Sequence, residues 1–461
     1  MSAPNLLTVK EALQQIREGK LTPSQLIQAC SDQIQRLNPH LNAFITVVHV
    51  PVAEEQHSPR GATAARGLLQ GIPVALKDLF ETAHVRTTAG SRFFSDHIPA
   101  ADATAVSKLK EAGAAIVGKT NTHEIALGVT TCNPHFGACL NPWDDSRIPG
   151  GSSGGSAVAV ATGMALAALG TDTGGSIRIP ASLCGVVGLK PTYGRVSLRG
   201  VFPLSWNLDH VGPIARTVAD AAIMLQVIAG FDAEDAYSID APVEDYQTHL
   251  DDGVRGWRIA MSSGGYVDEA DGEVLRAVRE AAETLASAGA DVAAVDVSFL
   301  HQAALANGLM TQADGAAFHR QRLAEHPDWF GEDVLRRLES GRDLPTGDYV
   351  LARRTQAEIR HRFRRFFTDY EILLMPSTPI TAPPIGGEDA VAQARRLTRF
   401  TAPFNLAGLP AVSVPCGFDS QGLPIGLQLI AGARREAELL RAAAAYERQR
   451  CWAARWPPSI V

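Results

Sequence analysis

The sequence has few cysteines and no spacing that would join them into disulfides. Only six occur in 461 residues. They are Cys30, Cys132, Cys139, Cys184, Cys416 and Cys451. Irregular spacing in so long a chain does not form a disulfide framework, so we predict reduced thiols.

Excess positive charge and long apolar runs are also missing. The formal net charge of −7, with dispersed lysine and arginine, provides no basic field, so we expect no nucleic-acid partner. The start, MSAPNLLTVK, lacks the charged and apolar parts of a secretory signal, which predicts a cytoplasmic protein. The longest apolar run, from Ser156 to Leu169, is too short to span a membrane. The hydrophobic fraction of 46% is still enough for a large core.

Helical and strand patterns alternate along the chain, which predicts an α/β fold. Thr8 followed by Glu11, and Thr22-Pro23 followed by Gln25, indicate the capped starts of two N-terminal helices. Predicted strands lie at residues 41–48, 71–78, 114–117, 258–261, 372–375, 411–414 and 425–430. Further predicted helices lie at residues 104–111, 155–165, 218–228, 272–286 and 436–449.

Two patterns imitate ligand sites, but their context argues against both. Residues 113–120 match G-x-x-x-x-G-K-[ST], yet the apolar strand lies between the glycines rather than before them, so we predict no phosphate loop. Cys132, His135 and Cys139 are metal ligands by type, and only His123 could supply a fourth. We predict ordinary loop residues there, and we expect no metal or other cofactor.

The stretch GGSSGG, residues 150–155, matches the G-x-S-x-G pattern of serine hydrolases in two registers. It follows SRIPG, whose proline and glycine indicate a loop, whereas a nucleophile elbow follows a hydrophobic strand. The 13 histidines nevertheless keep a Ser-His-Asp hydrolase open as an alternative.

A serine without a neighbouring histidine is the strongest indication of chemistry. Ser176 follows two glycines in GTDTGGSIRIPAS, residues 170–182. Lys77, in the apolar stretch GIPVALKD, can replace the missing base, because burial lowers the pKa of an ammonium group. Ser152 can carry the proton between the two side chains. Main-chain N–H groups around Gly174 can approach a substrate oxygen closely, as in an oxyanion hole.

Together these motifs resemble those of the amidase signature family. GIPVALKD, GGSSGGS and GTDTGGSIRIPA agree with the family in type, order and spacing, and a looser likeness extends over the whole chain. The resemblance implies an α/β/α sandwich in which helices cover both faces of a large mixed sheet. It implies one domain over residues 1–461. Its parts would be an N-terminal helical segment (1–65), a signature core (66–230), a variable helical cap (232–369) and a C-terminal part of the core (370–461).

The resemblance also implies a role for each site residue. Ser176 is the nucleophile, Ser152 is the bridging serine on a cis peptide bond, and Lys77 is the final base. The oxyanion hole is formed by the N–H groups of Thr173, Gly174, Gly175 and Ser176. The supporting residues are Ser153, Asp172 and Arg178. The implied reaction is hydrolysis of a carboxylic amide, or of a related ester or carbamate, through an acyl-enzyme.

The identity of the substrate is less well defined. One alternative within the family is the glutaminase subunit of a tRNA-dependent amidotransferase, which works in a complex and passes ammonia to a partner. That subunit usually has a Met-Asp-Glu-Phe-like stretch where this chain has residues 122–125, THEI, so the sequence favours a stand-alone amidase. We therefore expect a small-molecule amide, ester or carbamate as the partner, and a homodimer. The predicted pocket residues are Leu127, Val129, Thr131, Phe202 and Trp206.

Overall fold

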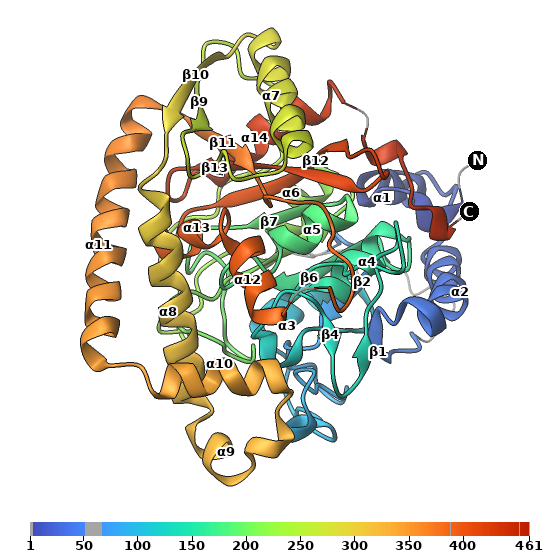
Figure 1. The fold of residues 1–461 in the computed structure, drawn as a ribbon. Coiled ribbons are helices and arrows are strands. Elements are labelled where there is room, and N and C mark those ends of the chain that lie inside the picture. The colour runs from blue at the N-terminus through green and yellow to red at the C-terminus, as the bar shows by residue number, and fades with distance from the viewer. Residues whose placement is uncertain (1–2, 51–66, 388, 451, 461) are drawn as a thin grey trace.

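The computed structural model describes residues 3–50, 67–387, 389–450 and 452–460. Their middle layer is one mixed sheet of 11 strands, in the order β1-β3-β2-β6-β8-β7-β12-β13-β11-β9-β10 (Figure 1). Strand β2 runs parallel to both β3 and β6, whereas β8, β7, β12, β13 and β11 pair antiparallel in turn. The predicted α/β fold with a large mixed sheet is confirmed.

The strands of this sheet are short and mostly buried. They are β1 (Phe44–Val47), β2 (Pro73–Lys77), β3 (Ala115–Thr120), β6 (Ala167–Thr171), β7 (Val187–Lys190), β8 (Val211–Ala215), β9 (Arg258–Ser263), β10 (Asp291–Asp296), β11 (Ile372–Pro376), β12 (Ala411–Phe418) and β13 (Pro424–Ala431). A separate pair consists of β4 (Cys132–Asn133) and β5 (Gly137–Ala138).

Helices surround the sheet. The α-helices are α1 (Val9–Arg17), α2 (Pro23–Leu41), α3 (Thr104–Glu111), α4 (Gly154–Ala161), α5 (Arg178–Cys184), α6 (Val218–Ile228), α7 (Gly272–Ser287), α8 (Leu300–Phe318), α9 (Arg320–Glu325), α10 (Glu332–Arg342), α11 (Thr346–Asp369), α12 (Ala390–Thr398), α13 (Ala402–Ala407) and α14 (Glu436–Glu447). The short 3-10 helices are η1 (Pro4–Leu6), η2 (Arg92–Phe94), η3 (Glu124–Ala126), η4 (Pro327–Trp329), η5 (Trp452–Ala454) and η6 (Pro458–Ile460).

The first two helices begin where the capping residues predict. The Thr8 side chain accepts from the Glu11 N–H, and the Thr22 side chain accepts from the Gln25 N–H, each within a reciprocal capping box. These bonds satisfy N–H groups that have no partner inside the helix, so the helix start is fixed locally.

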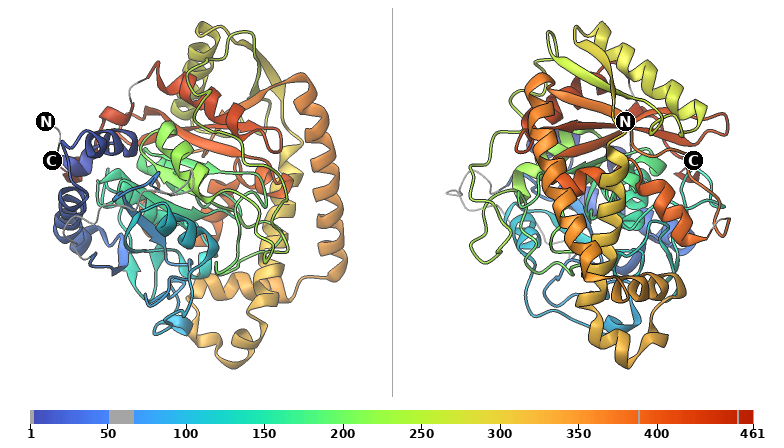
Figure 2. Two further views of the ribbon diagram at one scale, coloured as in Figure 1. Left: turned by 180° about the vertical axis from the view of Figure 1, so that it is seen from behind. Right: turned by 60° about the vertical axis from the view of Figure 1, so that its left-hand side comes forward.

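A packed apolar core lies on each face of the sheet. The apolar side chains of α4 and α5 pack on one face, together with part of α2. On the other face, α6, α7 and α14 pack against the strands. The view from behind in Figure 2 shows this second helical layer.

The predicted cap differs from the observed one. Within residues 232–369, strands β9 and β10 join the main sheet beside β11, so this part of the chain belongs to the core. Helices α8 and α11 lie side by side along one side of the molecule, the left side in Figure 1, with α9 and α10 at their end (Figures 1 and 2). The predicted boundary at residues 65 and 66 lies outside the described residues. In the described part of the chain, no helix is both long and apolar enough to cross a membrane.

Candidate active site

Lys77 is the last residue of the fully buried strand β2 and has no exposed surface. Its Nζ donates to Ser152 Oγ (2.6 Å) and to Thr171 Oγ1 (2.7 Å). Burial lowers the pKa of Lys77 to about 7, although the nearby carboxylates of Asp209 and Asp172 oppose this shift. A large fraction of this amine is therefore uncharged near neutral pH and can accept a proton.

Ser152 lies in the turn that leads into α4, after a cis Gly151–Ser152 peptide bond. The next residue, Ser153, donates its main-chain N–H to the carbonyl oxygen of Ser176 (3.2 Å). The turn needs glycine, because a Cβ at Gly154 would lie 2.4 Å from Thr131 Oγ1. The two serine-bearing segments, far apart in sequence, thus lie against each other beside Lys77.

Ser176 stands in the turn between β6 and α5, on the wall of a cavity of about 100 Å³. Only 6% of the residue is exposed. Gly175, directly before it, has φ of +135°, and a Cβ there would lie 2.1 Å from Thr401 Oγ1. Glycine is therefore required for this turn to present Ser176 to the cavity.

A buried ion pair between Asp172 and Arg178 holds the turn that carries Ser176. Arg178 Nε and Nη2 donate to the two carboxylate oxygens of Asp172 (3.0 and 2.9 Å), and both residues are fully buried. Burial by itself would raise the pKa of Asp172, but the Arg178 guanidinium holds it well below its usual range. The remaining Arg178 Nη1 donates to Gln428 Oε1 (2.6 Å) on β13, which ties the turn to the central sheet.

The structure corrects one part of the predicted oxyanion hole. The N–H of Gly175 donates to Asp172 Oδ1 (2.7 Å), so this group is already occupied. The N–H groups of Thr173, Gly174 and Ser176 donate to no other described residue. Of the four predicted N–H groups, three therefore have no partner among the described residues, and one has.

Two residues next to the site were missed by sequence reasoning. Thr171, at the end of β6, accepts from Lys77. Asp209 accepts from the Thr173 hydroxyl (2.6 Å), and burial raises the pKa of its carboxyl to about 6. Thr171 lies within residues 170–182, close to the predicted nucleophile, and Asp209 lies three residues after Trp206, but neither residue has a distinctive spacing. The contact of Thr171 with Lys77 exists because β2 and β6 are neighbours in the sheet, and that of Asp209 with Thr173 exists because β6 and β8 are neighbours.

The predicted pocket residues divide into two groups. Leu127 and Val129 line the Ser176 cavity. Thr131, Phe202 and Trp206 are not on its wall: Thr131 donates to the Gly150 carbonyl (2.7 Å), Phe202 packs on Phe94, and Trp206 borders a different depression beside α9. Instead, the cap supplies part of the wall through Asn307, Thr311 and Gln312 of α8. Asn307 also donates to the Thr173 carbonyl (3.1 Å).

The residues of the other two patterns that imitate ligand sites form a buried strand and contacts within the protein. Residues 115–120 form β3, and Lys119 donates to Thr87 Oγ1 (2.5 Å) in the interior. His135 contacts Glu124 (2.9 Å), and no group of three or more metal-ligating side chains that could hold an ion occurs in the described residues. The five cysteines that the structure describes are free, and Cys451 lies outside that part.

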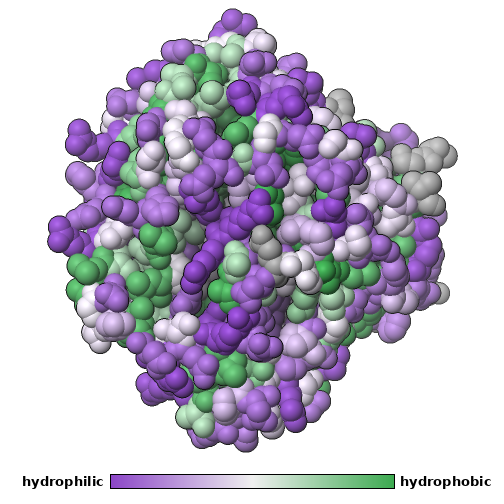
Figure 3. Space-filling view, viewed as in Figure 1, coloured by the Kyte–Doolittle hydropathy of each residue, from purple (hydrophilic) through white to green (hydrophobic). Residues whose placement is uncertain are grey.

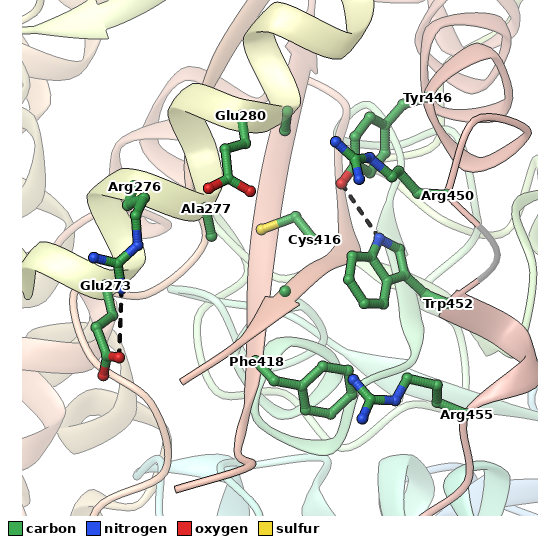
Figure 4. Close-up of a pocket in the computed structure, with 12 residues that line it drawn as sticks. Glu273, Arg276, Ala277, Glu280, Cys416, Phe418, Tyr446, Arg450, Trp452 and Arg455 are labelled. Carbon is green, nitrogen blue, oxygen red and sulfur yellow. Dashed lines mark hydrogen bonds and ion pairs between the residues drawn. The ribbon is translucent and has the colours of Figure 1, made fainter. Parts of the chain in front are cut away.

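A second cavity, of about 300 Å³, lies between α7, β12 and the chain after α14 (Figure 4). Two pairs of its polar groups contact each other: Trp452 Nε1 donates to Tyr446 Oη (3.3 Å), and Arg276 pairs with Glu273 (3.4 Å). Burial raises the pKa of the Cys416 thiol at its base, so this group stays protonated. Among the described residues that line this cavity, none is an activated nucleophile.

The histidine nearest to the Ser176 turn, His210, is bonded through its ring to the main-chain carbonyl of Asp172 (3.2 Å). Across the described ranges, no hydrogen bond joins a histidine ring to Ser176 or Ser152. The geometry therefore gives no support to the Ser-His-Asp alternative, which requires an imidazole bonded to the nucleophile.

Known proteins resemble the chain over almost its full length. The family model Amidase matches residues 25–440. A glutamyl-tRNA(Gln) amidotransferase subunit of Syntrophus aciditrophicus (strain SB) is 39% identical over 470 residues, covering 96% of this chain and 97% of that protein. The solved structure of the same-named protein from Thermotoga maritima has a TM-score of 0.84 at 37% identity, covering 97% and 96% of the two chains. A 6-aminohexanoate cyclic dimer hydrolase complexed with substrate has a TM-score of 0.88 at 28% identity, covering 99% and 100%.

The names of these relatives contradict the prediction about binding partners. A small-molecule partner alone, with no nucleic acid, is the wrong expectation, because the relatives are named as one subunit of an amidotransferase with glutamyl-tRNA(Gln) in its name. The expectation failed because it rested on the net charge of one isolated chain, which carries no information about the subunits of an assembly such as the one named for the relatives.

The motifs that suggested the family come together in one buried site, and the similarity is not confined to them. It extends through the sheet, the cap and both ends of the matched region. The chain belongs to the amidase signature family, whose enzymes act on C–N bonds.

Proposed function

We propose that this protein hydrolyses a carboxamide through a covalent acyl-enzyme on Ser176. The observation that carries the proposal is the buried contact between Lys77 Nζ and Ser152 Oγ at 2.6 Å, beside the cavity that holds Ser176. A lysine whose pKa is lowered to about 7 is a suitable general base at neutral pH.

In the first step, Ser176 Oγ attacks the carbonyl carbon while its proton passes to Ser152 and the Ser152 proton passes to Lys77. The N–H groups of Thr173, Gly174 and Ser176 stabilise the negative oxygen that forms. The C–N bond then breaks, and the relay returns the proton to the departing nitrogen, because an amine is a poor leaving group unless protonated. Water attacks the resulting ester through the same relay, which releases the acid and restores Ser176.

We further propose that the amide is the side chain of glutamine and that the chain is the ammonia-releasing subunit of an amidotransferase. The support is the full-length similarity to proteins named as subunits of glutamyl-tRNA(Gln) amidotransferases. The wall of the Ser176 cavity combines apolar side chains, such as Leu127 and Val129, with the polar side chains of Asn307 and Gln312, a lining typical of sites for small molecules.

A second candidate is a stand-alone hydrolase of another small amide. It is favoured by one observation: among the described residues that line the Ser176 cavity, none is acidic, so no carboxylate there pairs with an α-ammonium group. The similarity to a 6-aminohexanoate cyclic dimer hydrolase supports this candidate as well.

Release of ammonia by the purified chain tests the proposal. Glutamine and a panel of small amides are incubated with the wild type and with Ser176→Ala, and ammonia is measured by a coupled assay. Release from glutamine that disappears in Ser176→Ala supports the main proposal. Release from other amides but not from glutamine supports the second candidate. Equal release by both proteins would contradict the role of Ser176.

A further inference from the structure

The direction of each main-chain N–H group in the turn before Ser176 depends on the carbonyl group that precedes it. In a trans peptide bond, the C=O of one residue and the N–H of the next point in opposite directions across one rigid plane. A hydrogen bond to the carbonyl of residue 172, 173 or 175 therefore also fixes the N–H of residue 173, 174 or 176. These are the three N–H groups that have no partner among the described residues.

Two of the three preceding carbonyl groups are held by the core of the protein. The bonds are from Asn405 Nδ2 to the Asp172 carbonyl (2.8 Å), from the His210 N–H to the same carbonyl (3.1 Å) and from the Ile179 N–H to the Gly175 carbonyl (2.7 Å). The donors lie in α13, directly before β8 and in α5. The sheet and the helices beside it therefore fix the N–H groups of Thr173 and Ser176.

The peptide unit between Thr173 and Gly174 is held by a single side chain. Its carbonyl accepts from Asn307 Nδ2 (3.1 Å), and no other described residue donates to it. The next unit, Gly174–Gly175, is held at both ends, by Thr401 Oγ1 on its carbonyl (2.6 Å) and by a carboxylate oxygen on its N–H (2.7 Å). Because Gly174 has no Cβ, its backbone has wide conformational freedom, and the bond from Asn307 limits the rotation of this peptide unit.

Asn307 reaches the turn from the cap. It belongs to α8, is only 2% exposed and lines the Ser176 cavity. The helix itself lies at the surface, because Leu305, two positions earlier and on nearly the opposite face, is 63% exposed. Figure 3 shows apolar side chains at the surface over the positions that α8 and α11 have in Figure 1. One peptide group beside the nucleophile is thus held by the cap, whereas its neighbours are held by the core.

We propose that Asn307 is a positioning residue of the oxyanion hole, whose side-chain amide directs the Gly174 N–H toward the substrate oxygen. This inference rests on the proposed function, because the negative oxygen forms when Ser176 attacks a carbonyl group. The Gly174 N–H stabilises that oxygen more strongly in the transition state than in the bound substrate. Loss of the Asn307 amide should therefore lower the maximal rate and leave the substrate concentration for half-maximal rate nearly unchanged.

Two esters test the role of Asn307: p-nitrophenyl acetate and its analogue with C=S in place of C=O. Sulfur is a weak hydrogen-bond acceptor, so the ratio of the two acylation rates measures what the oxyanion hole contributes. The burst of p-nitrophenol gives each rate. Asn307→Leu keeps a similar volume without the N–H donor. We expect it to slow acylation by the oxygen ester about tenfold or more, and acylation by the sulfur ester at most about twofold. Asn307→Asp, which also removes the donor, should act in the same direction and serves if the leucine variant does not fold.

Gln33→Met is the matched control. Gln33 is also a buried amide on a helix, and its Nε2 donates to the Thr162 carbonyl (2.8 Å), but it does not line the Ser176 cavity. Its ratio of rates should stay within about twofold of the wild type, because no N–H group of the hole depends on it.

An unchanged ratio in the folded Asn307 variants would overturn the proposal, as would an equal fall in Gln33→Met. A weaker half-maximal concentration with an unchanged maximal rate would also overturn it, because Asn307 would then act in substrate binding. If the ester acylates Ser176 but no amide is hydrolysed, the proposed function fails, and the ratio still decides the role of Asn307. If wild type and Ser176→Ala release p-nitrophenol equally, the nucleophile is wrong and the inference fails with it.

Discussion

The buried amine of Lys77 makes the rate of acylation depend on pH around neutrality. Its pKa is lowered from 10.5 to about 7, and the uncharged form is the base, so the rate is low where Lys77 is protonated and rises with pH. With a midpoint near 7, about a tenth of the molecules hold the uncharged form at pH 6 and about nine-tenths at pH 8. With an ordinary lysine pKa, fewer than about one molecule in a thousand would hold it at pH 7.

The assay is the rate of Ser176 acylation by a small amide from pH 5 to 9, in the wild type and in Lys77→Met. Methionine fills a similar volume without an amine, so the comparison isolates the proton acceptor. We expect the wild-type rate to rise about tenfold per pH unit below 7 and to level off above about pH 8. The Lys77→Met rate should be about 10² to 10⁴ times lower and should lack this rise. A wild-type rate that first rises above pH 9, or a Lys77→Met rate near that of the wild type, would refute the reasoning.

Replacing Asp209 provides a second test of whether the pH–rate profile reports the pKa of Lys77. Its carboxylate raises the pKa of Lys77 by charge interaction. We therefore expect Asp209→Asn to move the midpoint of the wild-type profile to lower pH. Thermal melting at each pH serves as the control, because the pKa of Asp209 is itself raised to about 6 and its protonation could affect stability in this range. A midpoint that moves to higher pH would contradict the assigned interaction.

Three further predictions concern the surroundings of the site and the fold. Thr171→Val removes a hydrogen-bond acceptor of the Lys77 ammonium, so the midpoint of the pH–rate profile should fall; an unchanged midpoint would show that this bond does not tune the base. Asp172→Asn leaves the buried Arg178 without its carboxylate and should cost about 3–5 kcal/mol of unfolding free energy in a denaturant titration, whereas a loss below about 1 kcal/mol would contradict the support role. Thr22→Ala removes a helix cap and should cost about 1 kcal/mol with no change in kcat/KM; a change in kcat/KM would show an unexpected link to the site.

Local rules predicted those parts of the fold that depend on neighbouring residues. Helix α6 spans Val218–Ile228, as its apolar spacing indicates, and α2 begins after the Thr22 cap. Strand order could not be predicted from spacing alone, because pairings such as β2 with β6 depend on contacts between residues about 90 positions apart. For the same reason, β9 and β10 were assigned to a helical cap although they extend the sheet.

In the candidate site, too, local motifs were predicted from the sequence, whereas contacts between distant residues were not. The motifs identified Lys77, Ser152 and Ser176, and their assigned roles remain predictions. Thr171 and Asp209 were missed because only the packed sheet brings their side chains to the site. The occupied N–H of Gly175 could not be foreseen, since it follows from the direction in which Asp172 points. Trp206 was expected in the pocket from its place in the sequence, but its loop turns toward α9.

The central claim is that Ser176 is the nucleophile and that Lys77 activates it through Ser152. Mass mapping after labelling with a fluorophosphonate tests this claim most directly. The account predicts one adduct, on Ser176, formed at least about 100 times more slowly in Lys77→Met and in Ser152→Ala. An adduct on another residue, or labelling of Ser176 at the wild-type rate in both variants, would contradict it.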